Sequence, residues 1–376
     1  MHEVLSYMID KTQDMLQMLK AVVEHESPST DKAATDKLAS YLRDQFAMLG
    51  ARAELLPQAH YGNHVRVEWG KGEEQVLVLC HMDTVWSVGE IKKRPFRVDG
   101  ENAYGPGAFD MKAGIVHTYF ALKALNDLGL KSKKRIVVLL NTDEEIGSPS
   151  SRAIIEAEAR KSTHALVLEP SVPPLGAIKT FRKGVGMFKV AITGKAAHAG
   201  ADPEKGISAI GEMAHQIVRL HSMTDFKTGT TVNVGVVAGG TRSNVIAAEA
   251  HAEVDLRVAT KAEGERVVKE ILNLKPQIEG ATISVTGGMN RPPMERTPKI
   301  VEAYHFAKKL AAELGFELHE SGTGGGSDGN FTAAIGTPTL DGLGAVGAGG
   351  HAESEYLIIK HMPERAALLA RLFETL

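Results

Sequence analysis

Three apolar runs in the first half of the chain each lead directly into acidic or imidazole side chains. VLVLC is followed by His81, IVVLL leads to the pair Glu144 and Glu145, and ALVL leads to Glu169. Runs that are apolar at every position are typical of strands buried on both faces of a parallel sheet. In such sheets the ligand site lies beyond the carboxyl ends of the strands. The sequence therefore predicts that these polar side chains gather at one edge of a sheet.

Helical segments alternate with these strands, because apolar residues recur there at helical spacing. They span residues 4–24, 27–50, 111–129 and 148–161. The alternation predicts an α/β fold in which helices sandwich a mostly parallel sheet. From about residue 181, four half-buried strands and two helices predict a small α+β domain with an antiparallel sheet. We therefore expect a main domain formed by residues 1–180 and 291–376, with residues 181–290 inserted as a second domain.

The composition argues against several function classes. The formal net charge is −3, so there is no basic footprint for nucleic acid or for an anionic membrane. Aromatic residues make up only 5% of the chain, which leaves few platforms for stacking bases. No apolar run approaches the ~20 residues needed to span a membrane, and the first residues lack a signal-peptide pattern. We expect a cytoplasmic protein whose single cysteine, Cys80, is a small buried hydrophobe.

The candidate metal ligands combine two imidazoles with several carboxylates. They are His81, Asp83, Asp110, Glu144, Glu145, Glu169 and His351. This mixed set of nitrogen and oxygen donors suits zinc or a similar divalent ion. The carboxylates exceed the needs of one tetrahedral shell, which predicts two ions that share a bridging group. The set therefore indicates a hydrolase that uses a metal-activated water.

Each of these residues also has an ordinary alternative. Asp110 follows a glycine-rich turn that enters a helix, where an aspartate could simply cap the helix. The glutamates could be solvated surface groups and the histidines hydrogen-bonded loop residues, so the metal interpretation depends on their conjunction. Within it, Glu144 and Glu145 point different ways, so one can bind metal while the other accepts a proton. Asp83 follows His81 by two residues and can hold its second ring nitrogen.

Seven motifs along the chain resemble those of the M20 metallopeptidases and occur in the same order. They are HMDT, GPGAFDMKAG, NTDEEIGS, LEP, GKAAHAG, TGGGSD and GGHAE. The resemblance extends from about residue 60 to the end of the chain. That family contains di-zinc aminoacylases, deacylases, dipeptidases and carboxypeptidases. Within it the chain is most similar to the glutamate carboxypeptidases, and the Gly105-Pro106-Gly107 segment fits that branch, whereas many members carry Gly-Arg there.

The resemblance implies a catalytic main domain with two Zn²⁺ ions per chain, for which Co²⁺ or Mn²⁺ could substitute. His81 and Glu169 would bind one ion, and Glu145 and His351 the other. Asp110 would bridge the two ions. The resemblance further implies that Asp83 orients His81 and that Glu144 is the general base.

The inserted domain resembles the lid, or dimerisation, domain of the family, which implies a homodimer. His198 matches a lid histidine that helps to stabilise the tetrahedral intermediate, often from the opposite subunit. Asn244, Arg257 and Arg291 match positions that hold substrate carboxylates in glutamate-releasing members, and Gly325 could let backbone N–H groups approach a carboxylate. The ordinary alternatives are a turn histidine, a surface strand residue for Arg257 and a solvated linker charge for Arg291.

These expectations converge on a metal-dependent amidohydrolase or carboxypeptidase that acts on N-acyl amino acids or peptides. It would release a C-terminal amino acid, with glutamate as the first candidate. The alternatives are an N-acyl-amino-acid deacylase or dipeptidase with another side-chain preference, and a non-catalytic metal-binding homologue.

Overall fold

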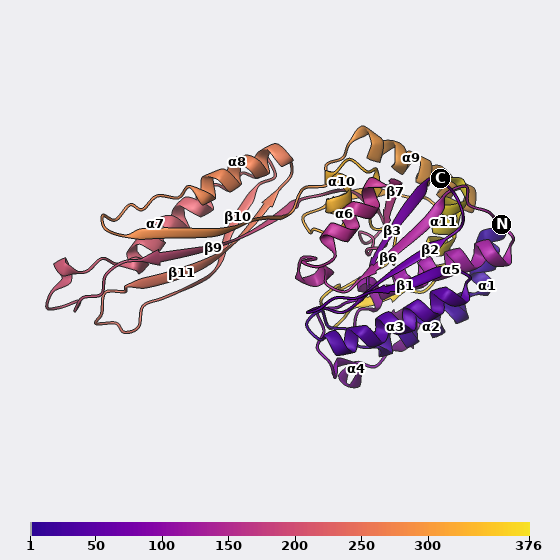
Figure 1. Cartoon of the computed structure of the whole chain (residues 1–376), viewed down its shortest axis with the longest axis horizontal. Coiled ribbons are helices and arrows are strands. Elements are labelled where there is room, and N and C mark those ends of the chain that lie inside the picture. The colour runs from indigo at the N-terminus through magenta and orange to yellow at the C-terminus, as the bar shows by residue number, and fades with distance from the viewer. Residues whose placement is uncertain (1) are drawn as a thin grey trace. The chain divides into compact units, whose positions relative to one another are not determined.

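The computed structural model describes residues 2–376, and the chain forms two compact units (Figure 1). Unit 1 contains the residues up to Phe181, Arg296–Gly322 and Ser327–Leu376, and unit 2 contains Arg182–Glu295 and Thr323–Gly326. The short segment Thr323–Gly326 belongs to unit 2 because the Arg182 guanidinium donates hydrogen bonds to the carbonyls of Gly325 and Gly326, at 3.2 and 2.9 Å. Gly325 therefore lies outside the range predicted for the inserted domain.

Unit 1 is built on a six-stranded sheet with the strand order β1-β2-β6-β3-β7-β14. Its strands are β1 (Arg52–Leu56), β2 (His64–Trp69), β3 (Gln75–His81), β6 (Arg135–Asn141), β7 (Ser162–Val167) and β14 (Thr339–Leu340). Strands β6, β3, β7 and β14 are parallel, whereas β1 and β2 form an antiparallel edge. The predicted α/β fold with a mostly parallel sheet is confirmed.

Helices cover both faces of this sheet. They are α1 (Glu3–Asp10), α2 (Thr12–Glu24), α3 (Lys32–Met48), α5 (Ala113–Asp127), α6 (Arg152–Arg160), α9 (Pro298–Leu314), α10 (Gly329–Ala334) and α11 (His361–Thr375). The segment predicted as one helix over residues 4–24 is two helices, interrupted at Lys11. Helix α3 begins after Asp31, whose carboxylate accepts a hydrogen bond from the Ala34 N–H at 2.9 Å.

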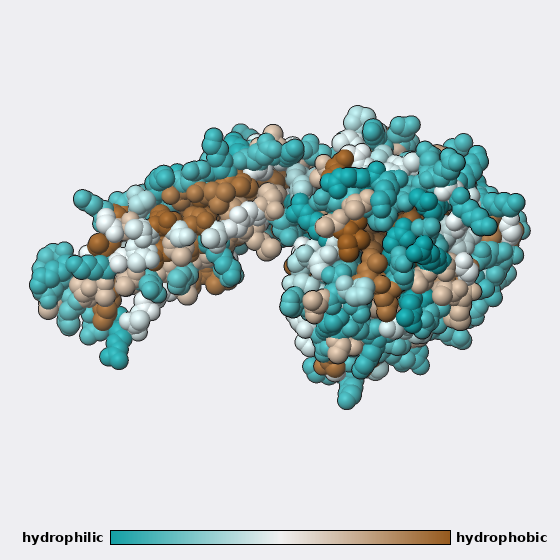
Figure 2. Space-filling view, in the orientation of Figure 1, coloured by the Kyte–Doolittle hydropathy of each residue, from teal (hydrophilic) through white to brown (hydrophobic). Residues whose placement is uncertain are grey.

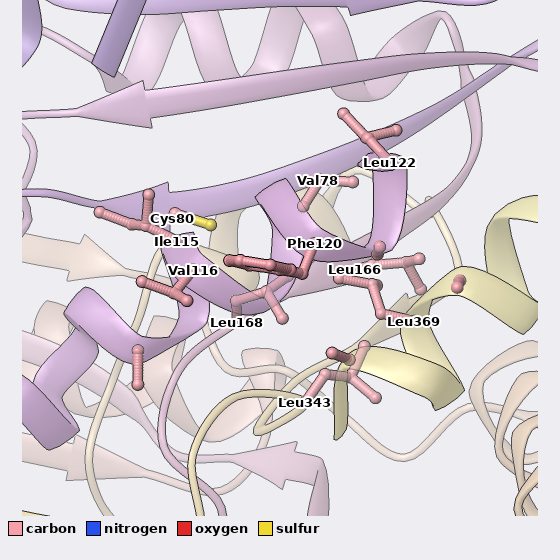
Figure 3. Close-up of a cluster of buried hydrophobic side chains, with 14 of the residues drawn as sticks. Val78, Cys80, Ile115, Val116, Phe120, Leu122, Leu166, Leu168, Leu343 and Leu369 are labelled. Carbon is pink, nitrogen blue, oxygen red and sulfur yellow. The ribbon is translucent and has the colours of Figure 1, made fainter. Parts of the chain in front are cut away.

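Strand β3 shows why both faces need helices, because every one of its residues is buried. Val78 and Cys80 point to the core shared with α5 and α11 (Figure 3), and Leu77 and Leu79 belong to a second core with α6 and α10. Cys80 is 1% exposed, and burial raises the pKa of its thiol to about 12. The thiol is thus a buried, protonated hydrophobic group, as the sequence predicted.

Shorter elements complete unit 1, and two of them end one residue inside unit 2, at Arg182 and Thr323. They are α4 (Glu90–Lys93), β4 (Arg97–Asp99), β5 (Asn102–Tyr104), β8 (Ile178–Arg182), β13 (Glu320–Thr323), β15 (Gly347–Ala348) and β16 (Tyr356–Ile358). Strands β15, β16, β5 and β4 form a small antiparallel sheet in that order, and β13 pairs with β8. Among residues 2–376, no helix combines the length and apolar character needed to cross a membrane.

Unit 2 is an antiparallel sheet with two helices on one face. Its strands follow the order β10-β11-β9-β12, and its elements are β9 (Gly184–Thr193), β10 (Thr231–Gly239), β11 (Glu249–Val258), β12 (Thr282–Arg291), α7 (Ala209–Ser222) and α8 (Lys261–Leu272). Along β11 every second residue is buried, and these residues form a core with α7 and α8. The predicted α+β insertion of four strands and two helices is confirmed.

Candidate metal centre

Five of the predicted metal ligands lie at or near the ends of the parallel strands or in two loops beside them. His81 is the last residue of β3, and Glu169 follows β7 by two residues. Glu145 lies in a short turn, Glu144–Ile146, after β6. Asp110 lies in the turn Ala108–Lys112 before α5, and His351 lies between β15 and β16. The carboxyl edge of the sheet therefore collects them, as expected for this class of sheet.

Asp110 faces two separate groups of ligands. In the first ligand set (His81, Asp110, Glu169), His81 Nε2 lies 3.2 Å from Asp110 Oδ1 and 3.5 Å from Glu169 Oε1. In the second ligand set (Asp110, Glu145, His351), His351 Nε2 lies 3.4 Å from Asp110 Oδ2 and 3.0 Å from Glu145 Oε2. Within each set the ligand atoms lie within 4.8 Å of one another. Asp110 thus offers one oxygen to each set, which is the arrangement of a bridging carboxylate.

The local backbone excludes the helix-cap alternative for Asp110. Its φ and ψ angles are −115° and 96°, and α5 begins only at Ala113, after Lys112. Asp110 is therefore not the residue that precedes the helix, and its carboxylate contacts His81 and His351 instead of the free N–H groups of the first turn.

The electrostatics of the centre fit divalent cations. Hydrogen bonds to Asp110 and Glu145 raise the pKa of His351 to about 11. At His81, burial lowers the pKa, but hydrogen bonds with Asp110 and Asp83 outweigh it and raise the pKa well above the ordinary value. The carboxylates thus attract positive charge strongly, and a metal ion can replace the imidazole protons as their partner. A donor set of three carboxylates and two imidazoles suits zinc or a similar divalent ion.

Asp83 connects the two loops that carry ligands. His81 Nδ1 lies 3.0 Å from the backbone carbonyl of Asp83 and 3.5 Å from its Oδ1, so the carbonyl is its nearer partner. The fully buried Asp83 carboxylate accepts hydrogen bonds from Ser29 Oγ at 2.6 Å and from the N–H groups of Glu144 and Glu145, at 3.3 and 3.2 Å. Asp83 therefore also holds the Glu144–Glu145 turn, a contact that the spacing of the sequence does not indicate.

His198 and Asn244 lie side by side in unit 2. The N–H of Ala199 donates to the Asn244 carbonyl at 3.0 Å, and His198 forms a bridge with Val245. His198 Nδ1 accepts hydrogen bonds from the N–H groups of Gly200 and Ala201, at 3.1 and 3.0 Å. In the neutral ring the proton must then be on Nε2, and the side chain is exposed.

Arg257 and Arg291 lie on either side of Val185 on the sheet of unit 2. Arg257 on β11 and Arg291 at the end of β12 both pair with Val185 of β9, so the three side chains share the face opposite α7 and α8. Asp255 holds the Arg257 guanidinium through two 2.9 Å contacts, and Arg257 Nη1 donates to the Gly324 carbonyl at 3.3 Å. The structure thus brings the two arginines and the glycine stretch together.

Two residues of the site were not recognised in the sequence. Ser29 supports Asp83, and Glu355 is a buried acid in the same glycine-flanked segment as His351. The one available signal for Glu355 was its position four residues after His351 in the GGHAESEY segment.

Comparison with known proteins identifies the family. The model of Peptidase family M20/M25/M40 matches residues 77–375. The chain belongs to this family. The resemblance inferred from the seven motifs is therefore confirmed, and the protein is an M20-family hydrolase.

Relatives of this M20-family chain include peptidases with different printed activities. Carboxypeptidase G2 of Pseudomonas sp. (strain RS-16) is 32% identical over 373 residues, which cover 96% of this chain and 89% of that protein. Aminopeptidase PepT from Bacillus cereus has a similar structure, with a TM-score of 0.76, 22% identity and coverage of 96% and 98% of the two chains. The Bacillus subtilis YXEP protein, described as a dinuclear metal-binding peptidase, gives a TM-score of 0.70, 18% identity and coverage of 97% and 99%.

The two ligand sets predict different effects of two substitutions on metal content. Asp110→Asn should lower the affinity for both ions, because Asp110 contributes an oxygen to each set. His351→Ala should lower the affinity only for the ion of the second set and leave the first ion bound. Equilibrium dialysis against Zn²⁺ with elemental analysis measures the stoichiometry, and His60→Ala, an exposed histidine of the same unit, is the matched control. Two ions retained at unchanged affinity in Asp110→Asn would contradict the bridging assignment.

Proposed function

We propose that this M20-family protein is a two-zinc amidohydrolase that releases a C-terminal amino acid, preferably glutamate, from N-acyl or peptide substrates. The observation that carries the proposal is the position of Asp110, with one carboxylate oxygen in each of two ligand sets. The 32% identity to a protein named Carboxypeptidase G2 supports the proposal that the substrate loses its C-terminal amino acid.

The residues of the metal centre divide into two groups with a shared member. His81 and Glu169 would hold one zinc ion, and Glu145 and His351 would hold the other. Asp110 would contribute to the binding of both ions. Bound zinc supplies Lewis acidity, which lowers the pKa of water and polarises a substrate carbonyl. The protein contributes a rigid set of oxygen and nitrogen donors, fixed by the buried Asp83.

Glu144 is the proposed general base. Its N–H is held by Asp83 Oδ1, and its neighbour Glu145 belongs to the second ligand set, so Glu144 lies next to the centre in the same turn. A carboxylate there accepts a proton from the attacking water and delivers it to the leaving nitrogen. His198 is proposed to donate a hydrogen bond from Nε2–H to the developing oxyanion, because its Nδ1 already accepts backbone hydrogen bonds.

Replacement of the base should separate catalysis from metal binding. Glu144→Gln preserves the size of the side chain but removes its basicity, so kcat should fall by roughly 10²–10⁴-fold while zinc content and KM stay near those of the unmodified protein. Glu73→Gln, an exposed glutamate of unit 1, is the control. Substantial turnover by Glu144→Gln with both ions bound would show that another group takes the proton.

Arg257 and Arg291 are the proposed anchors for the substrate carboxylates. A guanidinium offers parallel N–H groups that match a carboxylate, and glutamate released from the C-terminus of a substrate presents two such groups. The two arginines lie on one face beside Val185, and Asp255 fixes the orientation of Arg257. Two guanidinium groups on one face of the sheet, one of them the buried Arg291, would favour a dicarboxylate over an uncharged side chain. Asn244 and Gly325 are proposed as further polar contacts of the substrate.

A matched series of substrates tests this specificity. Zinc-loaded protein should hydrolyse N-acyl-glutamate faster than the N-acyl derivatives of Asp, Leu, Arg and ornithine, with all turnover abolished by a chelator. Arg291→Ala should raise KM for N-acyl-glutamate about 10–100-fold, because a hydrogen bond to a charged group is worth about 1.5–3 kcal/mol. The same substitution should raise the KM for N-acyl-leucine by a smaller factor. Preference for another amino acid would favour the deacylase or dipeptidase alternative.

We also propose that the protein forms a homodimer through unit 2. An apolar groove of about 300 Å³ lies between α7 and the edge strand β10, and Figure 2 shows apolar side chains gathered on the surface of this unit. Ile210 and Val237, which line this groove, are 48% and 57% exposed. An edge strand with exposed apolar residues is suited to pairing with another chain.

Light scattering should therefore give the mass of two chains. Val237→Lys should shift the protein to the monomer at micromolar concentration, because it places a charge on the apolar edge. Val98→Lys makes the same change at an exposed valine of unit 1 and should leave the mass unchanged. A monomeric unmodified protein would contradict the proposal.

A further inference from the structure

We propose that Glu355 is a positioning residue of the metal centre, which fixes the turn that carries Asp110 and ties it to the segment that carries His351. This inference rests on the two-metal function proposed above. Glu355 is separate from the ligands, since it belongs to neither ligand set. Its side chain is 2% exposed and lies against the backbone of the Asp110 turn.

Both oxygens of Glu355 are fully engaged. Oε1 accepts hydrogen bonds from the N–H groups of Phe109 and Asp110, each at 2.9 Å. Oε2 accepts from the N–H of Gly107 at 2.9 Å and from Trp86 Nε1 at 3.3 Å. An ionised carboxylate offers about four acceptor positions and no donor, so these four donors use its whole capacity. Three of them are backbone groups of one turn, which a single anion therefore holds in place.

The turn has little freedom to find another arrangement. Gly107 has a φ of +71°, and a Cβ at this position would lie 2.5 Å from Thr84 Cγ2. The N–H groups of Gly107, Phe109 and Asp110 converge on Glu355, so replacement of one carboxylate oxygen by an NH₂ group leaves buried donors without an acceptor. The backbone must then rotate, and the two oxygens of Asp110 would lose their simultaneous orientation toward both ligand sets.

Glu355 also belongs to the segment that carries His351. The N–H of Ala352 donates to the Gly349 carbonyl at 2.8 Å, and the N–H of Glu355 donates to the Ala352 carbonyl at 3.0 Å, so consecutive turns connect the two residues. His351 itself has a positive φ of 64°, a conformation that needs support from its surroundings. One short segment thus supplies a ligand of the second set and the anchor of the shared ligand.

The decisive substitution is Glu355→Gln, because it keeps the volume and shape of the side chain. The glutamine oxygen accepts two hydrogen bonds, but its NH₂ group would face two N–H donors. Glu353→Gln is the matched control, since Glu353 is exposed on the same segment and loses the same charge. Titration of the metal-free protein with Co²⁺, followed by visible absorption and electron paramagnetic resonance, measures affinity and the coupling between two ions.

We expect Glu355→Gln to bind Co²⁺ roughly 10–100-fold more weakly, in the range typical for residues that orient metal ligands. Its electron paramagnetic resonance spectrum should lose the magnetic coupling between the two Co²⁺ ions that a shared Asp110 produces. Glu353→Gln should match the unmodified protein in affinity and spectrum. Unchanged affinity and an unchanged spectrum in Glu355→Gln would overturn the proposal. A purely structural brace would lower the melting temperature without altering the coupling, and that result would overturn it as well.

Hydrogen exchange of the metal-free protein separates this inference from the proposed function. The amides of Gly107, Phe109 and Asp110 should exchange at least tenfold faster in Glu355→Gln, whereas amides of β3 should keep their protection and thereby show that unit 1 is folded. Failure of the unmodified protein to bind a pair of ions would remove the two-metal function. Unchanged exchange in the turn would instead remove the positioning role of Glu355.

Discussion

The concentration of negative charge around Asp110 is the constraint on which the site depends. The carboxylates of the two ligand sets share a small space at the edge of the sheet, and carboxylates at such distances repel one another unless cations lie between them. The imidazoles of His81 and His351 moderate this repulsion. The buried acids Asp83 and Glu355 have a different role, because they accept hydrogen bonds from backbone N–H groups and thereby hold the loops. Ligands and supports are thus chemically alike but differ in their partners.

Much of the fold could be predicted from the sequence, because strands buried on both faces leave an unmistakable apolar pattern. The runs that became β3 and β6 predicted both the parallel sheet and the edge near which His81 and Glu145 lie. The prediction that Asp110 bridges two ions came from family resemblance, since its position in the sequence alone fits a helix cap equally well. Only the turn geometry, with its non-helical φ and ψ, excludes the cap.

The features that sequence reasoning missed depend on contacts between residues distant along the chain. The glycine stretch Thr323–Gly326 joins unit 2 through hydrogen bonds to Arg182 and Arg257, which lie far earlier in the sequence. Glu355 is one of many acidic residues in the chain, and its importance follows only from the three N–H groups that converge on it. No local periodicity records such convergence, so the residue types alone could not reveal it.

The order of the ligands along the chain has a consequence for the biosynthesis of the protein. His81, Asp110, Glu145 and Glu169 all precede unit 2, whereas His351 and Glu355 lie in the segment that returns to unit 1 after it. A nascent chain that ends within unit 2 therefore holds the complete first ligand set but lacks a ligand of the second set and the anchor of the Asp110 turn. Such a chain also lacks β14, α9 and α11 of the surrounding core. The full centre can therefore assemble only when the polypeptide is nearly complete.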